Sequence, residues 1–583
     1  MPSNTHIKSD GKRDGETKTY RVFVTDTFND NQISATQTWL EGLVKDKTKM
    51  RVVEVFPWEK AGGWDEDEFN KWSNDGKYNS DVFNNMKVDG WSLVLLDSAG
   101  YEEVSKKTGW VRAIKEPLRQ EIMGPVPGAE SNRIEDLEPR KFSWGDWEAQ
   151  EGDATILSQI SCYKPCDHIE SENDYVYEKR AGEGVLVYLV EYGVQVDVKW
   201  DKDKNIKYFP DIDSNEIVQT EPFTKTGKDP RLDQGTKNKG HTTRVASQIV
   251  GKYGAAKKVT LVPVQVVEKD NDQEEPLRGF REALKHYIEK QKTSPNIKAV
   301  FVMAMGWSAA AQEPQLTRET AEQDEDGKSW MKLLKSVWNA GIPVVLASGN
   351  DGSVRKDIDM IPQVLEKGDD FPIINVGAAE YWGKAWSSTQ GQGTGENSQL
   401  TIYAVGVDVL VQNNVNGVHG PTEGTSFAAP AVAGVIALHS VYEPWDKGMK
   451  KEARVKAIRN FIRSPESSWT VLENQPLDVN MIWNGADEDA YKQVGLLANT
   501  QSTATTGSSQ QPTATAAPQP QSDGKSLIIG LEQIGSPRCT SICPPLANAG
   551  CSTTCDAQHD YENRLFFYSL NNHVEEVVSL CTS

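Results

Sequence analysis

A serine at the start of a small-residue, apolar segment constrains this chain more than any other feature. The segment Gly424–Gly434 reads Gly-Thr-Ser-Phe-Ala-Ala-Pro-Ala-Val-Ala-Gly and predicts a tight turn followed by a helix. The unpaired N–H groups and the positive dipole end of that helix would stabilise an oxyanion beside Ser426. Gly424 lets a substrate approach the backbone, and Pro430 lies near the helix start, where a missing N–H costs least. The segment predicts a nucleophilic serine, with a simple N-cap on a helix packed against a sheet as the alternative.

A nucleophilic serine needs a base, and a histidine begins a second motif. His241 opens the sequence His-Thr-Thr-Arg-Val-Ala-Ser, which predicts the start of an amphipathic helix. The segment Tyr253–Leu261 then leads into an apolar strand. A histidine at a helix start is often only a cap or a surface residue, so that alternative stays open. His286 lies on the flank of another predicted helix and receives no role.

Two further polar residues follow apolar runs that predict buried strands. Glu191 ends the run Val185–Val190, whose uniform hydrophobicity is typical of a strand covered on both faces. Asn350 ends the sequence Ala-Ser-Gly-Asn, which follows the apolar residues Val344–Leu346. The plain alternatives are a glutamate that ends a strand without a catalytic role, and an ordinary Asn-Asp-Gly turn.

The order acid, histidine, serine over about 235 residues resembles the subtilisin-like serine proteases (peptidase S8 family), in particular their fungal, proteinase K-like branch. The resemblance implies a serine endopeptidase with Ser426 as nucleophile and His241 as base. It further implies that Glu191 orients the histidine and that Asn350 donates to the oxyanion. The family's acid is an aspartate, and the extra methylene of Glu191 moves the carboxylate by about an ångström, which can cost on the order of a hundredfold in rate. On this basis Glu191→Asp is expected to keep or raise activity.

The resemblance also implies a cleft that binds polypeptide substrates in an extended conformation, as an added strand. The residues that match substrate-binding positions of the family are Ala304, Met305, Gly306, Trp307, Gly349, Gly424 and Thr425. Trp307 replaces a glycine, and its ring is expected either to stack on a substrate residue or to fill the specificity pocket. Thr242 replaces the glycine after the histidine. With Glu191, these departures motivate an alternative function, a catalytically impaired subtilisin-like protein that binds peptides or proteins through the same cleft.

The wider pattern of apolar segments predicts the fold class. Apolar segments at 185–190, 259–267, 298–305, 343–348 and 373–377 alternate with helical stretches, which is typical of an α/β fold with a mostly parallel central sheet. The resemblance implies the three-layer arrangement of the subtilisin-like fold. A lipase or another α/β hydrolase is disfavoured, because those enzymes use the order serine, acid, histidine and a Gly-x-Ser-x-Gly turn.

Composition shifts divide the chain into six expected segments. These are a disordered N-terminus (1–18), an α+β domain (19–117), a connector (118–150), a peptidase domain (151–498), a Ser/Thr/Pro/Gln linker (499–524) and a cysteine-containing tail (525–583). Strand-like and helix-like pieces in 19–117 follow the order β-α-β-β-α-β, which resembles the inhibitory propeptide of subtilisin-like enzymes. The N-terminal domain is therefore a candidate inhibitor of the chain's own peptidase domain, and Arg140-Lys141 is a candidate processing site.

Charge and cysteine content limit the partners. The 63 basic and 84 acidic residues give a net charge of −21, which argues against a nucleic-acid partner. No apolar run approaches 18 residues, so no membrane span is expected. Of the seven cysteines, those in the tail 525–583 favour disulfides over a zinc site. The tail, the linker and the family point to secretion. Against secretion, the polar first residues lack a signal-peptide core and no Asn-x-Ser/Thr sequon occurs. The reaction requires no cofactor; structural calcium is common in the family, but the sequence assigns it no residues.

Overall fold

The computed structural model divides the chain into two compact units, Met1–Thr500 and Gln501–Ser583. The described residues are 17–25, 29–55, 59–60, 63–64, 87–122, 146–150, 155–162, 174–192, 194, 218–219, 240–251, 253–266, 274–309, 315–381, 383–392, 399–412, 419–449, 451–470, 479–497, 540–542, 552–554, 565–568 and 574–577. The expected N-terminal segment up to residue 16, the candidate processing site at 140–141, the linker 499–524 and the tail cysteines lie outside these residues. Cys162, the one cysteine among them, is disulfide-bonded.

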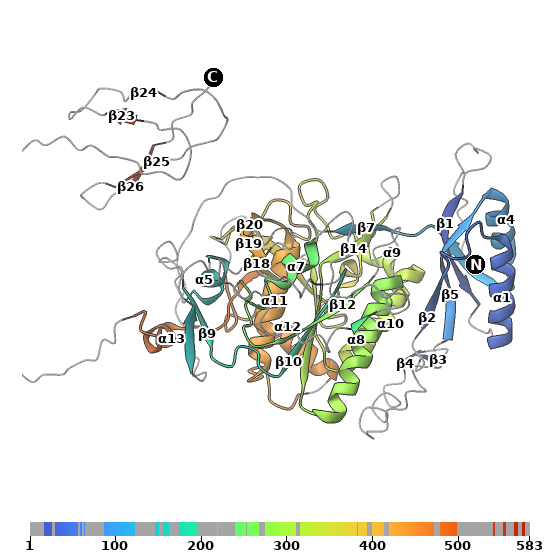
Figure 1. Cartoon of the computed structure of the whole chain (residues 1–583), viewed down its shortest axis with the longest axis horizontal. Coiled ribbons are helices and arrows are strands. Elements are labelled where there is room, and N and C mark those ends of the chain that lie inside the picture. The colour runs from blue at the N-terminus through green and yellow to red at the C-terminus, as the bar shows by residue number, and fades with distance from the viewer. Residues whose placement is uncertain are drawn as a thin grey trace, which may run out of the picture. The chain divides into compact units, whose positions relative to one another are not determined.

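The first part of the larger unit is a four-stranded antiparallel sheet with two helices on one face (Figure 1). Asn29 starts the first helix with a capping box, in which its side chain and that of Gln32 each accept the other's backbone N–H. The element order is the β-α-β-β-α-β order that the sequence predicts, with a short hairpin inserted before β5. The elements are β1 Lys18–Val24, α1 Asp30–Leu43, β2 Arg51–Val55, the hairpin β3 Glu59–Lys60 and β4 Gly63–Trp64, β5 Lys87–Leu96, α4 Ser98–Lys106 and β6 Val111–Lys115.

A nine-stranded sheet forms the centre of the remaining part of this unit, in the order β11-β12-β10-β13-β15-β17-β18-β22-β21. Every neighbouring pair is parallel except β21 with β22, which confirms the predicted α/β class and the mostly parallel sheet. The five predicted strands coincide with β10, β12, β13, β15 and β17 to within two residues at each end. The strands are β10 Val185–Glu191, β11 Val218–Gln219, β12 Thr260–Gln265, β13 Lys298–Met303, β15 Val344–Ala347, β17 Ile374–Ala379, β18 Ile402–Val405, β21 Ser468–Thr470 and β22 Asn480–Ile482.

Helices cover both faces of this sheet, as the alternation of side chains along β10 shows. The hydroxyl of Tyr188 lies 2.8 Å from Nδ1 of His286, on helix α8 (Glu274–Thr293). Glu191 is out of phase with Tyr188 and contacts helix α7 (His241–Ala246) on the opposite face. Helix α11 (Thr425–Ser440) packs against α7 and the central strands, and all 16 of its residues are buried. A helix without a polar face must be buried in this way.

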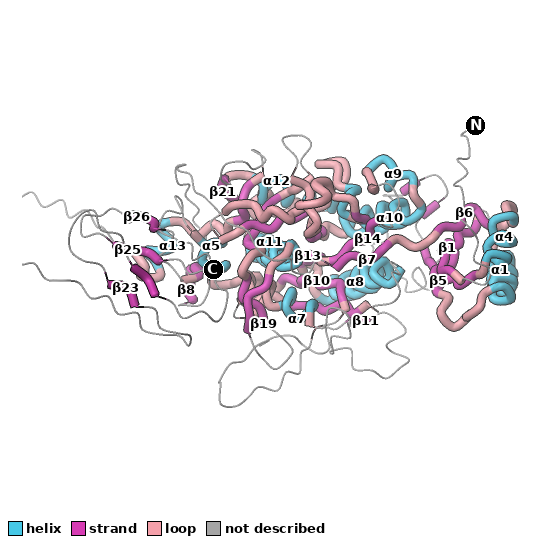
Figure 2. Tube along the Cα trace, turned by 90° about the horizontal axis from the view of Figure 1, so that it is seen from above, coloured by secondary structure: helices cyan, strands magenta, loops and turns pink. Residues whose placement is uncertain are grey.

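A smaller sheet of three strands lies beside the large one, in the order β16-β14-β7. Its strands are β7 Arg119–Ile122, β14 Met305–Ser308 and β16 Met360–Ile361, and both outer strands run antiparallel to β14. Both views show β7 alongside β14 (Figure 1; Figure 2). The other described elements of this unit are β8 Trp147–Gln150, α5 Thr155–Ser161, β9 Tyr175–Glu178, α9 Arg318–Gln323, α10 Glu325–Asn339, the 3-10 helix η3 Gln363–Leu365, β19 Val409–Gln412, β20 His419–Thr422, α12 Lys451–Arg463 and α13 Glu488–Gln493.

The second unit contains two short antiparallel hairpins. One joins β23 (Thr540–Ile542) to β24 (Ser552–Thr554), and the other joins β25 (Leu565–Tyr568) to β26 (Val574–Val577). Across the described parts of both units, no helix combines the length and hydrophobicity needed to cross a lipid bilayer.

Candidate active site

Glu191 and His241 come together at the carboxyl end of strand β10, which is the edge where parallel sheets carry their sites. Gly240 adopts the left-handed conformation and places His241 as the first residue of α7. Nδ1 of His241 contacts Oε1 of Glu191, and both side chains are fully buried. Because a carboxylate oxygen only accepts, Nδ1 is the donor in this contact, which leaves Nε2 as the other ring nitrogen. Among the described residues, Nε2 of His241 and Oε2 of Glu191 have no hydrogen-bond partner.

Ser426 is the second residue of α11, and His241 lies beside the same turn of that helix. Gly424 precedes the helix with φ 137°, a conformation that disfavours other residues, and its N–H donates to the carbonyl of Gly406 at 2.7 Å. The ring of His241 is 5.8 Å from the ring of Phe427, measured between centroids. The fold therefore brings the predicted acid and histidine to the helix turn that carries the predicted serine.

Asn350 is held by Thr425, the residue before the serine. Its Oδ1 accepts from the backbone N–H of Thr425 at 3.0 Å and from the Thr425 hydroxyl at 2.9 Å. A backbone N–H can only donate, so this contact identifies the carbonyl end of the amide and directs the NH₂ group away from Thr425. The N–H of Gly349 donates to the same hydroxyl at 3.2 Å. Thr425, predicted as a substrate-binding residue, thus orients the amide of Asn350.

The predicted cleft wall is strand β14, together with Ala304 before it. Met305, Gly306 and Trp307 are all on this strand, and the side chains of Met305 and Trp307 are fully buried. The ring of Trp307 stacks on that of Trp330 from α10, with centroids 6.0 Å apart and planes 28° apart. Trp307 therefore packs inside the protein. Alternation along the strand places its side chain on the face opposite to Gly306.

Strand β7 occupies the other edge of β14. Ile122 pairs with Met305, Glu121 with Gly306, Gln120 with Trp307 and Arg119 with Ser308. These residues fall in the segment 118–150, where the sequence predicts only a polar connector. The sequence Arg-Gln-Glu-Ile does not alternate between apolar and polar residues. Such an alternation is not needed here, because strand addition uses backbone hydrogen bonds. The sequence therefore gave no signal for this strand.

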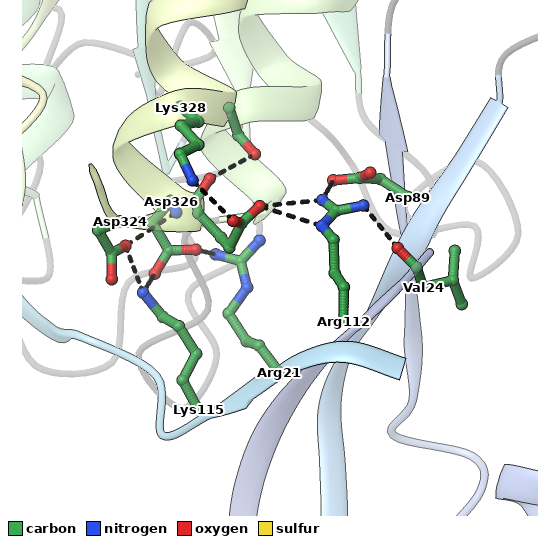
Figure 3. A network of polar contacts seen from close by, with 10 residues as sticks. Arg21, Val24, Asp89, Arg112, Lys115, Asp324, Asp326 and Lys328 are labelled. Carbon is green, nitrogen blue, oxygen red and sulfur yellow. Dashed lines mark hydrogen bonds and ion pairs between the residues drawn. The ribbon is translucent and has the colours of Figure 1, made fainter. Parts of the chain in front are cut away.

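A network of ion pairs joins the N-terminal sheet to the start of α10 (Figure 3). Arg21 of β1 and Asp326 of α10 are both almost fully buried, and Nη1 lies 2.5 Å from Oδ1. Lys115 contacts Asp326 as well and lies 2.5 Å from Asp324. The network is completed by Arg112, whose Nη2 is 2.8 Å from Asp89 and 3.0 Å from Glu325. Sequence patterns did not reveal it, because the charges come from segments about 200–300 residues apart.

The described residues contain no group of three or more His, Cys, Asp or Glu side chains arranged to hold a metal ion. Thr242, the second departure from the family pattern, is buried after His241, and its Oγ1 has no hydrogen-bond partner within the described part of the chain.

One protein-family model matches part of this chain. Residues 182–467 match the model of Peptidase S8, the subtilase family. The chain is 26% identical over 303 residues to subtilisin-like protease 2 of Arthroderma otae, covering 51% of this chain and 59% of that protein. It is 28% identical over 270 residues to a subtilisin-like protease of Coccidioides posadasii, covering 46% and 55%.

Two further proteins give partial matches. Subtilisin-like serine protease Pen c 2 of Penicillium citrinum is 23% identical over 335 residues, covering 55% of this chain and 63% of that protein. The crystal structure of a cold-adapted subtilisin-like serine proteinase aligns with a TM-score of 0.39 and 19% identity, covering 57% of this chain and 98% of that one. The matches span less than two thirds of the length of the three fungal relatives.

Proposed function

Because residues 182–467 match the model of the subtilase family, we propose that this chain is a serine endopeptidase that hydrolyses peptide bonds through an acyl-enzyme. The observation that carries the proposal is the contact of Glu191 with Nδ1 of His241, beside the helix turn that bears Ser426. This contact supplies a serine with an oriented base, which is the minimum that nucleophilic catalysis by a hydroxyl requires.

In the proposed reaction, Oγ of Ser426 attacks the peptide carbonyl carbon while Nε2 of His241 takes the hydroxyl proton. The imidazolium then gives that proton to the leaving amine as the C–N bond breaks. Water attacks the resulting ester with the same base and releases Ser426. Glu191 accepts from Nδ1 throughout, so it keeps Nε2 as the basic nitrogen and stabilises the imidazolium when it forms.

The oxyanion of the tetrahedral intermediate would be held by the NH₂ group of Asn350 and the backbone N–H of Ser426. The two hydrogen bonds from Thr425 to Oδ1 support this assignment, because they fix the amide before the substrate arrives. Donors that are already oriented stabilise developing charge without the cost of reorganising during the reaction. The first turn of α11 adds the positive end of its dipole.

We further propose that the N-terminal domain inhibits this peptidase. An extended substrate would add to the edge of β14, and β7 holds that edge in the intact chain. The ion pairs between Arg21, Arg112 or Lys115 and the start of α10 add a second attachment (Figure 3). Release of residues 119–122 from β14 would therefore have to precede substrate binding.

Hydrolysis of an unfolded polypeptide tests the proposal. The full chain, incubated until its N-terminal domain is cleaved or released, should generate new amino termini from reduced, unfolded casein. Ser426→Ala and His241→Ala should lose this activity to background, whereas Ser440→Ala, at the far end of the same buried helix, should retain it. Hydrolysis that persists in Ser426→Ala would overturn the assigned nucleophile.

The alternative is a catalytically impaired member of the family that binds peptides in the same cleft. It is favoured by three departures from the family pattern close to the site, Glu191, Thr242 and Trp307. Peptide binding by the wild-type chain without any hydrolysis would select this alternative.

A further inference from the structure

Met360 lies between two glycines that flank the candidate active site. A Cβ atom on Gly306 of strand β14 would lie 3.1 Å from Cβ of Met360. A Cβ atom on Gly349, the neighbour of Asn350, would lie 2.8 Å from Cε of the same methionine. Met360 is fully buried. Its side chain therefore spans the distance from one wall to the other, and only the missing side chains of the two glycines leave room for it.

The position of the reacting groups shows which part of a substrate would need this space. This step rests on the proposed function. The acyl carbon must meet Oγ of Ser426 while its oxygen meets the amide of Asn350, so the α-carbon bonded to it lies close to Gly349. A substrate strand on the edge of β14, antiparallel like β7, brings the same residue to the Gly306 wall. The side chain on the acyl side of the cleaved bond is thereby directed between Gly306 and Gly349.

The side chain of Gln363 connects strand β14, which carries Gly306, to strand β15, which precedes Gly349. Nε2 of Gln363 donates to the carbonyl of Met305 at 2.9 Å and to that of Ala347 at 3.0 Å. The first carbonyl belongs to β14 and the second to β15, so one buried side-chain amide is hydrogen-bonded to both strands. Asn375 in turn donates to the carbonyl of Gln363 at 3.0 Å. Moving β14 away from β15 would break these buried hydrogen bonds and leave their polar groups unsatisfied.

Gln363 also borders the space between Gly306 and Gly349. Oε1 of Gln363 would lie 2.9 Å from a Cβ atom on Gly306, so it borders the same space as Met360. Pairing of Trp307 with Ile361 puts these two side chains on the other face of the small sheet, and neither fills this space. Met360 and Gln363 therefore border this space, together with Oε1 of Gln390, which would lie 2.0 Å from a Cβ atom on Gly349. The ring of Trp307 does not border it.

We propose that Met360, backed by Gln363, restricts the residue on the acyl side of the cleaved bond to small side chains such as glycine, alanine and serine. A larger residue would have to displace a methionine that is already packed on both sides. Because one methylene in an apolar pocket changes discrimination by roughly 10–200-fold, exclusion of a leucine or phenylalanine should exceed about tenfold.

A series of peptides that differ only at this residue tests the proposal. With the processed wild-type protein, kcat/KM for the alanine peptide should exceed that for the leucine and phenylalanine peptides by at least about tenfold. In Met360→Gly and Met360→Ala the ratio should shift toward the large residues by a similar factor. Ile361→Ala is the matched control, because it removes a buried side chain from the same strand on the opposite face. Thermal unfolding identifies which variants are folded.

Binding to Ser426→Ala separates this proposal from the proposed function. Peptides that end in alanine, leucine or phenylalanine are titrated into the full-length Ser426→Ala chain, with and without Met360→Gly. Competition by β7 lowers the affinity of every peptide by the same factor. The ratio of the affinities for two peptides therefore still measures the preference for the residue at their ends. Absence of hydrolysis by wild type, with binding that favours alanine, would overturn the peptidase and keep the role of Met360. Equal binding or cleavage of alanine and phenylalanine peptides, or an unchanged ratio in folded Met360 variants, would overturn that role.

Discussion

Nδ1 of His241 contacts Oε1 of Glu191 directly, although Glu191 is one methylene longer than the aspartate of the family pattern. Both side chains are fully buried, and Glu191 is the last residue of a strand that pairs in register on both sides. Pairing with Gln265 of β12 fixes the position of its backbone, so the length of the side chain decides whether the carboxylate reaches the imidazole. In this structure the longer acid makes that contact.

The first prediction concerns Glu191→Asp and reverses the expectation from the resemblance alone. Shortening the side chain withdraws the carboxylate by about an ångström from Nδ1, and errors of this size can cost about a hundredfold in rate. We therefore expect kcat/KM to fall by about that factor in a folded protein. Glu191→Gln keeps the length of the side chain but removes its charge. Comparing the two variants separates the effect of side-chain length from the effect of the negative charge. Equal or higher activity of Glu191→Asp would show that the strand end adjusts.

The second prediction concerns the support of Asn350 by Thr425. Thr425→Val keeps the backbone N–H but removes the hydroxyl that donates to Oδ1, so the amide loses one of two anchors. We expect kcat to fall by about tenfold, while Thr425→Ser retains activity. Asn350→Ala should cost about 10²–10³ in kcat, a range known from a subtilisin, a member of the family whose model matches residues 182–467.

A double-mutant cycle shows whether Thr425 acts through Asn350. If it does, Thr425→Val should have little further effect on kcat once Asn350→Ala is present, since contacting residues are not additive. Independent, multiplicative losses would show that Thr425 contributes in another way.

The third prediction concerns attachment of the N-terminal domain. Asp326→Asn removes the negative charge that faces the buried Arg21, and breaking a buried pair typically costs about 3–5 kcal/mol. In the intact chain, a fluorophosphonate should then label Ser426 at least about tenfold faster. Glu116→Gln is the control, because its pair with Lys18 is more than half exposed on both sides and should matter little. Equal labelling rates in all three proteins would contradict a docking role for the network.

The fourth prediction is a dependence of stability on pH that comes from His439, in the last turn of α11. Burial lowers the pKa of His439 from 6.5 to about 4, against an opposing hydrogen bond to the carbonyl of Trp483. The unfolded chain therefore binds more protons than the folded one between about pH 6.5 and pH 4. The free energy of unfolding must fall as the pH drops through that window, by on the order of 3 kcal/mol from this group.

His439→Gln should remove that part of the pH dependence. Denaturant unfolding at pH 7 and pH 4.5 should show a smaller loss of stability in the variant than in wild type, because the other titrating groups are common to both. An identical loss in the two proteins would mean that His439 does not titrate on unfolding.

The sequence predicted those parts of the fold and site that depend on local pattern. Uniformly apolar runs such as Val185–Val190 identify strands buried on both faces, and the helix from Thr425 to Ser440 follows from an apolar segment that begins after a glycine. The residues Glu191 and His241 were chosen from separate motifs, and topology brings them together because parallel strands end at one edge of the sheet.

The features that the sequence did not predict are contacts between segments that lie far apart along the chain. The pairing of β7 with β14 uses backbone groups that any residue carries, so the residue types of the segment Arg-Gln-Glu-Ile do not predict it. Trp307 was expected at the substrate, but only the position of Trp330 shows that its ring has a partner inside the protein. The brace of Gln363 across Met305 and Ala347 likewise requires three segments in register, and no single motif contains it.

Labelling of Ser426 by a fluorophosphonate tests the central claim most directly. After the N-terminal domain is released, mass spectrometry of the digested protein should find one phosphonyl adduct, on the peptide that contains Ser426. His241→Ala should slow its formation sharply, and Ser426→Ala should abolish it. A folded, released wild-type protein that never forms the adduct, or that forms it on another residue, would contradict the account of Ser426 as an activated nucleophile.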